Sequence, residues 1–498
     1  MGVIIRQGFK ASISNYIGLV LGFVSLYLLQ PKFYEPEELG AIRIFIELGT
    51  VLSAFSLVGT HYSINRFFPF FRTSDQKNHG FFFWAFSFPM FGYALLIIVL
   101  AFFGTDFFTF INPKAAQYES LLPLLLILIF ITLYQTVTEV SCANHGRITV
   151  PNFMREVVTR ILIIIAGMLY YFKFISFYAS MWMIVSAYFI ALCGNLWFLS
   201  KLTTINLKPD MNFLKKNPEL KKDVFKFTLL LFFSGIAALV VPKIDLFLIS
   251  SIRENLAEVA IYSVGFYLAT FIEVPKRTIL QIANPIISKL MREEKFDEVE
   301  SLNKKNGTNQ LLISGILFFL IWLNIDNLYA LMPKGEIYVK GKWVVFYIGI
   351  SKMIDALVCG NSPIITNSKF YSLSAISIVV AAVSSILFNY VLISKFGLIG
   401  GAISTILVML CVNLCNLILL QFKLNINPFD SRQIRIALVL GLFICSTFIG
   451  PWLNGPILDS VVKTSVMGSL LIFTLYKLKV SDEFNELLSG KMKHLFKF

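Results

Sequence analysis

Long apolar runs recur along the whole chain, and each is long enough to cross a lipid bilayer. A helix of about 20 predominantly apolar residues spans the hydrocarbon core. No polar domain separates the runs. They place the expected helices at residues 9–30, 40–62, 81–103, 119–140, 150–172, 176–199, 224–250, 256–276, 309–330, 343–365, 370–392, 397–421, 434–451 and 460–477. The pattern predicts an all-α polytopic membrane protein with about fourteen transmembrane helices.

The composition excludes a water-soluble fold. Hydrophobic residues make up 57% of the 498 residues and charged residues 14%, with a mean hydropathy of +0.74. A soluble domain typically carries about 25% charged residues. The net charge of +14 indicates no nucleic-acid partner, because no soluble domain gathers the basic residues into one patch. The six cysteines all fall within or beside apolar runs, which is typical of small buried hydrophobes and not of a disulfide framework or a metal site.

The distribution of basic residues predicts the orientation in the membrane. With the N-terminus placed inside, 30 of the 43 Lys and Arg residues fall in inner loops and span ends, and nine fall outside. The positive-inside rule then places both termini in the cytoplasm. Arg6 and Lys10 before an apolar run resemble a signal peptide, but the run continues to about residue 30 and is too long for one. We therefore expect a retained first helix.

A basic segment divides the expected helices into two series. We predict an N-terminal six-helix bundle at 1–199, a basic cytoplasmic linker at 200–223, a C-terminal six-helix bundle at 224–421, and two additional transmembrane helices with a cytoplasmic tail at 422–498. The segment 37–41 (EELGA), which opens the second span, is echoed by 257–261 (AEVAI), which opens the eighth. Duplicated halves are common in transporters, where the substrate site lies between the repeats.

The two longest loops, 200–223 and 277–308, are both basic and both fall on the predicted cytoplasmic side. Neither reaches the length of about 50 residues that an independent domain needs. In the second loop four apolar residues share one helical face, as in an interfacial helix, although Pro285 would kink it. These residues are Ile279, Ile282, Ile286 and Leu290. A solvated connector is the alternative.

Eight of the ionisable residues within the predicted spans are candidate functional residues. A charge at mid-bilayer costs about 2.5 to 3.5 kcal/mol, so such a residue normally faces a cavity or a partner. The cations are Arg43, Arg160, Lys243 and Lys352, and the carboxylates are Glu47, Asp245, Glu273 and Asp355. The alternative is that Arg43 pairs with Glu47 and Lys352 with Asp355 as structural ion pairs along one helix. Arg43, near the end of its span, can also snorkel.

Further charged residues and two prolines mark the ends and breaks of spans. His61 and Arg66 close the second span, and Lys276 and Arg277 close the eighth, near the predicted cytoplasmic face, which makes them candidate gate residues. Pro242 and Pro275 each remove a backbone hydrogen bond, which leaves carbonyls free to line a cavity and makes these positions candidate hinges. For Pro275 simple helix termination is the alternative.

Enzyme signatures are absent from the sequence. We find no GxxxxGK[ST] loop, no HExxH helix and no GxSxG elbow. No two of the four histidines lie within one helical turn, which argues against a metal site. We therefore expect no enzymatic activity and no cofactor. A proton or a monovalent cation, bound by the carboxylates, is the candidate coupling ion.

Several segments resemble a known family when taken in order. They are 33–40 (FYEPEELG), Gly59 through 66–69 (RFFP), 260–263 (AIYS) with Pro285, 389–393 (NYVLI) and 396–402 (FGLIGGA). Their order and spacing over nearly the whole chain resemble the oligosaccharide flippases of the polysaccharide-transporter branch of the multidrug/oligosaccharidyl-lipid/polysaccharide exporter superfamily. The resemblance implies two pseudo-symmetric six-helix bundles plus two C-terminal helices around a central cavity that opens alternately to each side.

The resemblance also implies a substrate. Members of the family move undecaprenyl-pyrophosphate-linked oligosaccharides (O-antigen or capsule repeat units) across the bacterial inner membrane, and cationic cavity residues are thought to hold the pyrophosphate. Arg43, Arg160, Lys243 and Lys352 match that role in charge and placement. We expect lipid-linked oligosaccharide and membrane lipids as partners, a monomer, and a polysaccharide polymerase and a chain-length protein as candidate associates. The alternatives are a drug/cation exporter or lipid II flippase on the same fold, or a membrane-embedded polymerase or ligase.

Overall fold

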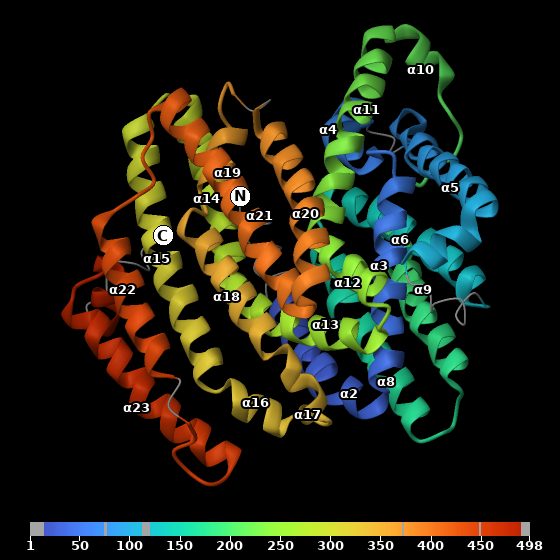
Figure 1. Ribbon diagram of the computed structural model, residues 1–498. Helices are drawn as coiled ribbons and strands as arrows, with labels where there is room; N and C mark the ends of the chain where they lie inside the picture. Colours follow the sequence, from blue (N-terminus) through green and yellow to red (C-terminus); the bar gives the residue numbers. More distant parts are fainter. Residues whose placement is uncertain (1–13, 74–76, 112–119, 371–372, 448–449, 490–498) are drawn as a thin grey trace. The chain divides into compact units, whose positions relative to one another are not determined.

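The computed structural model describes residues 14–73, 77–111, 120–370, 373–447 and 450–489. Within these ranges the regular structure is entirely helical. The chain forms two compact units, unit 1 (Met1–Ala260) and unit 2 (Ile261–Phe498). The start of the expected span 9–30, with Arg6 and Lys10, lies outside the described residues. The chain is therefore a polytopic all-α membrane protein, and Figure 1 shows its helices in sequence colours.

Unit 1 begins with a helix described from Ser14 to Phe33, which ends in η1 and α2. Its other elements are α3 (Pro36–Ser56), α4 (Thr60–Phe71), η2 (Asn78–Gly80), α5 (Phe81–Ile111), α6 (Leu122–Asn144), α7 (Thr149–Phe153), η4 (Met154–Val158), α8 (Thr159–Tyr171), α9 (Phe177–Leu202), α10 (Met211–Lys216), α11 (Pro218–Val240), η5 (Val241–Lys243), α12 (Ile244–Arg253) and the start of α13 (Leu256–Thr270). Two of these elements are not α-helical: η4 is a turn of π-helix, and η5 is a turn of 3₁₀-helix.

Helix α6 forms the centre of unit 1. It packs against α3, α4 and α9, and its inward side chains Leu124, Leu128 and Leu133 are fully buried. Helix α11 packs against α3 and α4. The first helix approaches η4 so closely that a Cβ on Gly18 would lie 2.6 Å from the Cβ of Glu156. A buried apolar centre of this kind, with apolar side chains such as Phe91 and Trp197 exposed on the outside, is typical of a bundle solvated by lipid.

Unit 2 contains the rest of α13 and the C-terminal helices. They are η6 (Phe271–Glu273), α14 (Val274–Arg292), α15 (Phe296–Leu323), α16 (Ile325–Leu331), α17 (Gly335–Tyr338), η7 (Val339–Gly341), α18 (Lys342–Leu357), α19 (Asn361–Thr366), α20 (Ser374–Phe396), α21 (Leu398–Leu419), η9 (Leu420–Leu424), α22 (Ser431–Ser446), α23 (Pro456–Lys477) and α24 (Asp482–Leu488). Helix α18 packs against α15 and α21, and α20 pairs along its length with α21.

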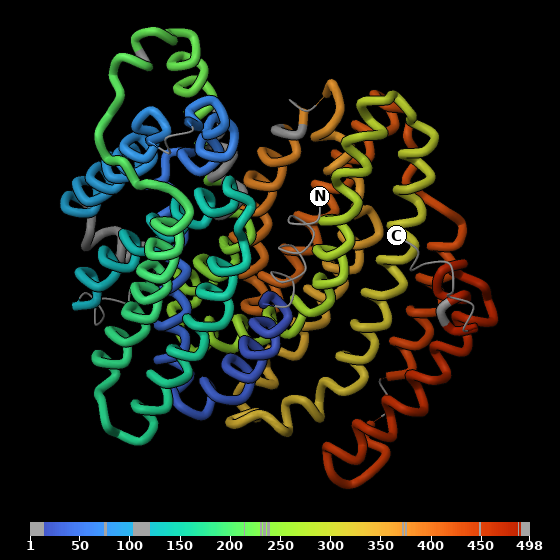
Figure 2. Tube along the Cα trace, turned by 180° about the vertical axis from the view of Figure 1, so that it is seen from behind, coloured from blue at the N-terminus to red at the C-terminus, as the bar shows by residue number. Residues whose placement is uncertain are grey.

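The last two long helices of unit 2 are docked on α15. Leu311 and Phe319 of α15 form one apolar cluster with Ile436 and Leu440 of α22 and with Leu471 of α23. Figures 1 and 2 show α22 and α23, in red, running beside α15, in yellow, from both sides of the molecule. The two additional helices expected at 422–498 are therefore part of the packed core of unit 2.

Each of the fourteen expected spans corresponds to helix in the structure, but several helices are broken. Ten helices in the described ranges are long and apolar enough to cross a membrane. The spans expected at 150–172, 224–250 and 343–365 are interrupted, by η4, by η5 and by the turn between α18 and α19. The span expected at 434–451 corresponds to α22, which has 16 residues. The span expected at 40–62 ends early, because Val58 and Gly59 adopt positive φ between α3 and α4.

Unit 1 extends to Ala260 and so includes α11 and α12, which the sequence suggested as the start of the second bundle. The division into two six-helix bundles, and the cavity that the family resemblance implies, stay predictions. One contact in unit 1 does involve both halves of the suspected repeat. Gly40, in the first copy, lies against the backbone of Leu256, directly before the second copy.

Replacing Gly40 by Ala is expected to destabilise the protein. A Cβ at this position would lie 1.8 Å from the carbonyl oxygen of Leu256, so one backbone must move. Overpacking of this kind costs about 1 to 3 kcal/mol. The melting temperature of the purified protein in detergent measures it. Gly441→Ala is the control, because nothing lies within 4 Å of a Cβ there. Equal melting temperatures for the two variants would contradict the packing described.

Candidate functional site

The charged residues predicted from the sequence lie at or beside breaks in the helices. Lys243 belongs to η5, Glu273 to η6, and Lys352 and Asp355 to the last turns of α18 before its break. Arg160 follows the π-helical turn η4. A break in a transmembrane helix leaves backbone groups unpaired, and this is tolerated where they face protein or a water-filled cavity. Charged side chains and unpaired backbone groups therefore occur together at these helix breaks.

In unit 1, Glu47 of α3 forms an ion pair with Lys243 of η5, and both side chains are about a quarter exposed. Arg43, one turn before Glu47, donates a hydrogen bond of 2.5 Å to the side-chain oxygen of Gln30. The cation that pairs with Glu47 is therefore Lys243, which lies far from it in the sequence.

A second charged group in unit 1 surrounds η4. Arg160 pairs with Glu156 at 2.9 Å, and Arg155 bridges Glu156 at 3.2 Å and Glu139 of α6 at 2.5 Å. Sequence reasoning left out Glu139 and counted Arg155 only as a basic residue at the inner end of the span expected at 150–172. The i,i+4 pair Gln135 and Glu139, within a predicted span and joined by a 3.3 Å hydrogen bond, was the available signal.

Both charged groups of unit 1 act electrostatically on one tyrosine. Tyr188 of α9 interacts in this way with Arg43, Glu47, Glu156 and Arg160. The sequence identified Arg43, Glu47 and Arg160 as candidates but gave no link between them.

The remaining unit 1 candidates are Asp245, His61 and Arg66. Asp245 is buried in the first turn of α12, where its carboxylate accepts a hydrogen bond of 2.9 Å from the Leu246 amide. His61 is partly buried on α4 beside Tyr62. Arg66 is exposed and places its guanidinium 4.3 Å from the ring centre of Phe227 on α11. The gate role of His61 and Arg66 stays a prediction.

In unit 2 the carboxylate of Glu273 is shared by two cations. Lys352 of α18 pairs with it at 2.5 Å, and Arg277 of α14 pairs with it at 3.0 Å. The side chains of Glu273 and Lys352 are only 17% and 15% exposed, whereas Arg277 is 67% exposed. The ammonium of Lys352 also lies 5.8 Å from the ring centre of Phe266. Lys352 is thus a mostly buried cation with one carboxylate partner and one aromatic neighbour.

Lys276 and Asp355 form a second pair between α14 and α18, and both are less than a fifth exposed. The ion pair considered for Lys352 and Asp355 along one helix is therefore wrong, because each residue has its partner on α14 or η6. Two ion pairs instead connect the break before α14 to the end of α18.

The two prolines lie where the helices are interrupted. Pro242 is in η5, directly before Lys243, and Pro275 is the second residue of α14, two residues after Glu273. The backbone breaks that the sequence predicted at these prolines are therefore confirmed. Their action as hinges stays a prediction.

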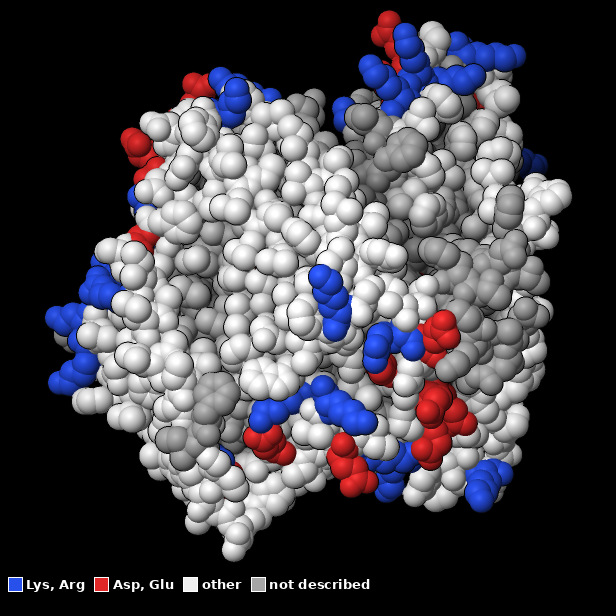
Figure 3. Space-filling model, viewed as in Figure 1, with Lys and Arg blue, Asp and Glu red and all other residues white. Residues whose placement is uncertain are grey.

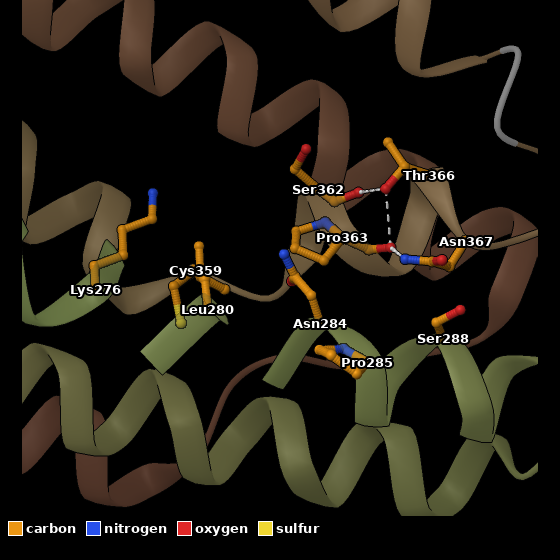
Figure 4. Close-up of a pocket in the computed structure, with 10 residues that line it drawn as sticks. All are labelled: Lys276, Leu280, Asn284, Pro285, Ser288, Cys359, Ser362, Pro363, Thr366 and Asn367. Atoms are coloured by element: carbon orange, nitrogen blue, oxygen red, sulfur yellow. Dashed lines mark hydrogen bonds between the residues drawn. The ribbon is translucent and has the colours of Figure 1, made fainter. Parts of the chain in front are cut away.

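A pocket of about 630 Å³ lies beside the Lys276–Asp355 pair, between α14 and the segment from Cys359 to Asn367. Lys276, Leu280, Asn284 and Ser288 follow one another at intervals of four residues on one face of α14. Figure 4 shows this face opposite Ser362, Thr366 and Asn367, with Lys276 at one end. The lining offers uncharged hydrogen-bonding groups next to a paired cation.

The other face of α14 explains why the sequence suggested an interfacial helix. Ala283, Ile287 and Met291 are buried in an apolar cluster with residues of α19 and η9. Ile282 and Ile286 are 64% and 45% exposed. The helix therefore has a buried face, a pocket-lining polar face and an exposed apolar face. Packing against α19 argues against a solvated connector over Val274–Arg292.

Among the described residues each unit thus holds mostly buried cations paired with carboxylates, close to a helix break. A paired cation can exchange its carboxylate for another anion at low cost, because one charge-assisted hydrogen bond replaces another. The same cation would be costly in hydrocarbon without a partner. Such a site is suited to holding an anionic group temporarily.

Comparison with known proteins gives a fold. No family model matches the sequence, and no curated protein matches it. Among solved structures, the lipid II flippase MurJ in an inward closed conformation is similar over 93% of this chain and 99% of its own, with a TM-score of 0.65 and 15% identity. This chain has the MurJ-like fold. An inward-facing multidrug resistance MATE family transporter of the MOP superfamily is similar over 86% of this chain and 95% of its own, with a TM-score of 0.56 and 12% identity.

Proposed function

We propose that this protein is a flippase that moves undecaprenyl-pyrophosphate-linked oligosaccharide units across the bacterial inner membrane by alternating access, for surface polysaccharide biosynthesis. The observation that carries the proposal is the set of mostly buried, carboxylate-paired cations at helix breaks, above all Lys352 with Glu273 and Lys276 with Asp355. A pyrophosphate cannot cross hydrocarbon without compensation, and cations held in protein can provide it. The MurJ-like fold supports a transporter.

In this proposal the carboxylates that pair with the cations also bind the coupling ion. With no substrate present they balance the cations, and when an anionic headgroup takes their place they become free to bind a proton or a monovalent cation. Glu273 and Asp355 in unit 2, and Glu47 in unit 1, are the candidates. This exchange would couple substrate binding to an ion gradient.

The pocket in unit 2 supports a glycan-bearing substrate. Asn284, Ser288 and Ser362 present amide and hydroxyl groups in the pocket that Lys276 lines at one end, and such groups match sugar hydroxyls. A cavity of about 630 Å³ lies within the usual size range of small-ligand sites, about 300 to 1,000 Å³. In the proposal the pyrophosphate contacts the cation, and the first sugar occupies the neutral part of the pocket.

Lipid II flipping is the second candidate, favoured by the structural likeness to MurJ. Both substrates carry a pyrophosphate, so the cations do not separate them. Drug export is favoured less, because a cationic drug would meet Lys276, Arg277 and Lys352 in unit 2. A membrane-embedded polymerase or ligase has no support from the two solved structures, which are a flippase and a transporter.

Deleting the gene in cells that make a surface polysaccharide tests the proposal. Lipid-linked repeat units should accumulate on the cytoplasmic side while surface glycan is lost. Complementation with Arg160→Ala or Lys352→Ala should fail to restore export at normal protein levels, because each substitution removes a cation from the proposed site. Normal export by both variants would refute the cationic site. Unchanged surface glycan in the deletion strain would refute the function itself.

A further inference from the structure

The two basic loops of the chain differ in how their charges are compensated. In the second loop, Lys295 lies 3.1 Å from Glu293 and Lys289 lies 3.8 Å from the same carboxylate. The hydrogen bond from Lys295 lowers the pKa of Glu293 below its usual value. Further along, Lys304 pairs with Glu300 at 2.5 Å and Lys305 pairs with Glu483. This loop therefore neutralises much of its own charge.

The first basic loop, 200–223, does not neutralise its charge in this way. Six exposed lysines lie between the end of α9 and the second turn of α11, and none has an ion-pair partner among the described residues. They are Lys208, Lys215, Lys216, Lys221, Lys222 and Lys226. The segment also holds three carboxylates. Asp210 is engaged, because a hydrogen bond of 3.1 Å from His79 holds the pKa of its carboxyl below the usual value. Glu219 and Asp223 are exposed and form no ion pair with these lysines among the described residues, so the segment keeps a net positive charge. Figure 3 shows blue side chains gathered over α10 and the start of α11.

Apolar side chains are exposed among these lysines. Leu207, Met211, Phe225 and Leu229 are 57%, 52%, 64% and 51% exposed. Together with the six lysines they form what we call the linker surface. Lysines interspersed with exposed large apolar side chains are typical of segments that lie in the headgroup region of a membrane.

The linker surface is held in a fixed place on unit 1. The ring of Phe213 stacks on His79 of η2, with ring centres 4.0 Å apart and planes 10° apart. A Cβ on Gly80 would lie 2.4 Å from the carbonyl oxygen of Lys208, so the two backbones touch. Asn78 also donates a hydrogen bond of 3.1 Å to the Thr203 hydroxyl. The lysines of α10 are therefore presented by an anchored segment.

We infer that the linker surface is a binding site for the headgroups of anionic phospholipids. Uncompensated lysines attract the negative surface of a membrane that contains anionic lipid, and the attraction rises with the number of lysines. Exposed apolar side chains at the same place add burial that a soluble anion cannot provide. Phe225 and Leu229 lie in the first part of α11, at the start of its apolar stretch, so the surface adjoins an apolar length of helix.

Native mass spectrometry of the full-length protein in neutral detergent tests this inference. Added phosphatidylglycerol should bind with higher affinity than phosphatidylcholine. The triple variant Lys215→Gln, Lys216→Gln, Lys222→Gln should lose roughly a hundredfold in affinity for phosphatidylglycerol. The matched control Lys289→Gln, Lys295→Gln, Lys304→Gln removes the same charge from the self-neutralised loop and should change the affinity by less than about threefold. Inorganic phosphate should compete poorly with the lipid.

Three results would overturn the inference: wild-type protein without preference for phosphatidylglycerol, an equal loss in both triple variants, or displacement of the lipid by inorganic phosphate at similar concentration. Folding does not obscure the outcome. The substituted lysines of the linker surface are exposed and make no ion pair among the described residues, so the melting temperature of that variant should match wild type.

Discussion

Substitution of Lys352 by Ala is expected to lower glycan export by roughly 10- to 100-fold. The substitution removes one charge-assisted contact to the proposed anionic substrate, worth about 1.5 to 3 kcal/mol. The fold should tolerate the loss better than is usual for a buried pair, because Glu273 keeps Arg277 at 3.0 Å. Surface glycan, normalised to the amount of protein in the membrane, measures the effect.

Exchanging the charges of Lys352 and Glu273 distinguishes a role in transport from a role in stabilising the fold. In Glu273→Lys with Lys352→Glu the ion pair can form again, and Arg277→Gln in the same protein keeps two cations from facing each other, so a purely structural role predicts recovered export. The substrate role predicts no recovery, because the cation has moved to the end of another helix. Lys342→Ala is the control on the same helix, since Lys342 pairs with Asp326, which is 71% exposed. Exposed pairs contribute at most about 1 kcal/mol, so export should stay normal.

Substitution of Asp459 by Ala is expected to cost about 3 to 5 kcal/mol of stability, the loss typical of breaking a buried ion pair. Its carboxylate is 1% exposed and pairs at 2.7 Å with Lys463, one turn along α23. It also accepts hydrogen bonds from Asn327 of α16 at 2.6 Å and from the amides of Trp452 and Leu453 at 2.7 and 3.0 Å. Alanine would leave all of these donors without an acceptor.

Thermal unfolding in detergent measures the effect, and a double variant checks its cause. Asp459→Asn with Lys463→Met keeps an acceptor for the amides and removes the buried ammonium, so it should regain most of the stability. Replacing a buried ion pair by uncharged residues of similar size is often neutral. If the double variant were as unstable as Asp459→Ala, the buried charge would not be the cause.

The sequence predicted the helices well, because hydrophobic runs depend on local composition. It also identified the buried cations and carboxylates, which stand out against an apolar background. It could not predict their partners. Glu47 and Lys243 are 196 residues apart, and Lys276 and Asp355 are 79 apart, so no helical spacing links them. Helical spacing suggested a pair of Lys352 with Asp355, but Lys352 pairs with Glu273 of η6 and Asp355 with Lys276 of α14.

Two basic residues that were counted only at the ends of expected spans have carboxylate partners in the structure. Arg155, at the inner end of the span 150–172, lies in the π-helical turn η4 and pairs with Glu139. Lys463, at the outer end of the span 460–477, is buried within α23, which begins at Pro456. In the second case the i,i+4 spacing from Asp459 was visible in the sequence and would have predicted the pair.

Reconstitution into proteoliposomes tests the central claim most directly. Purified protein is incorporated into vesicles with labelled undecaprenyl-pyrophosphate oligosaccharide, and a membrane-impermeant reagent measures how quickly the label crosses between leaflets. The account predicts faster crossing with wild-type protein than with empty vesicles, and a rate for Lys352→Ala close to that of empty vesicles. Crossing of the oligosaccharide lipid no faster than in empty vesicles, while lipid II or a cationic drug is moved, would contradict it.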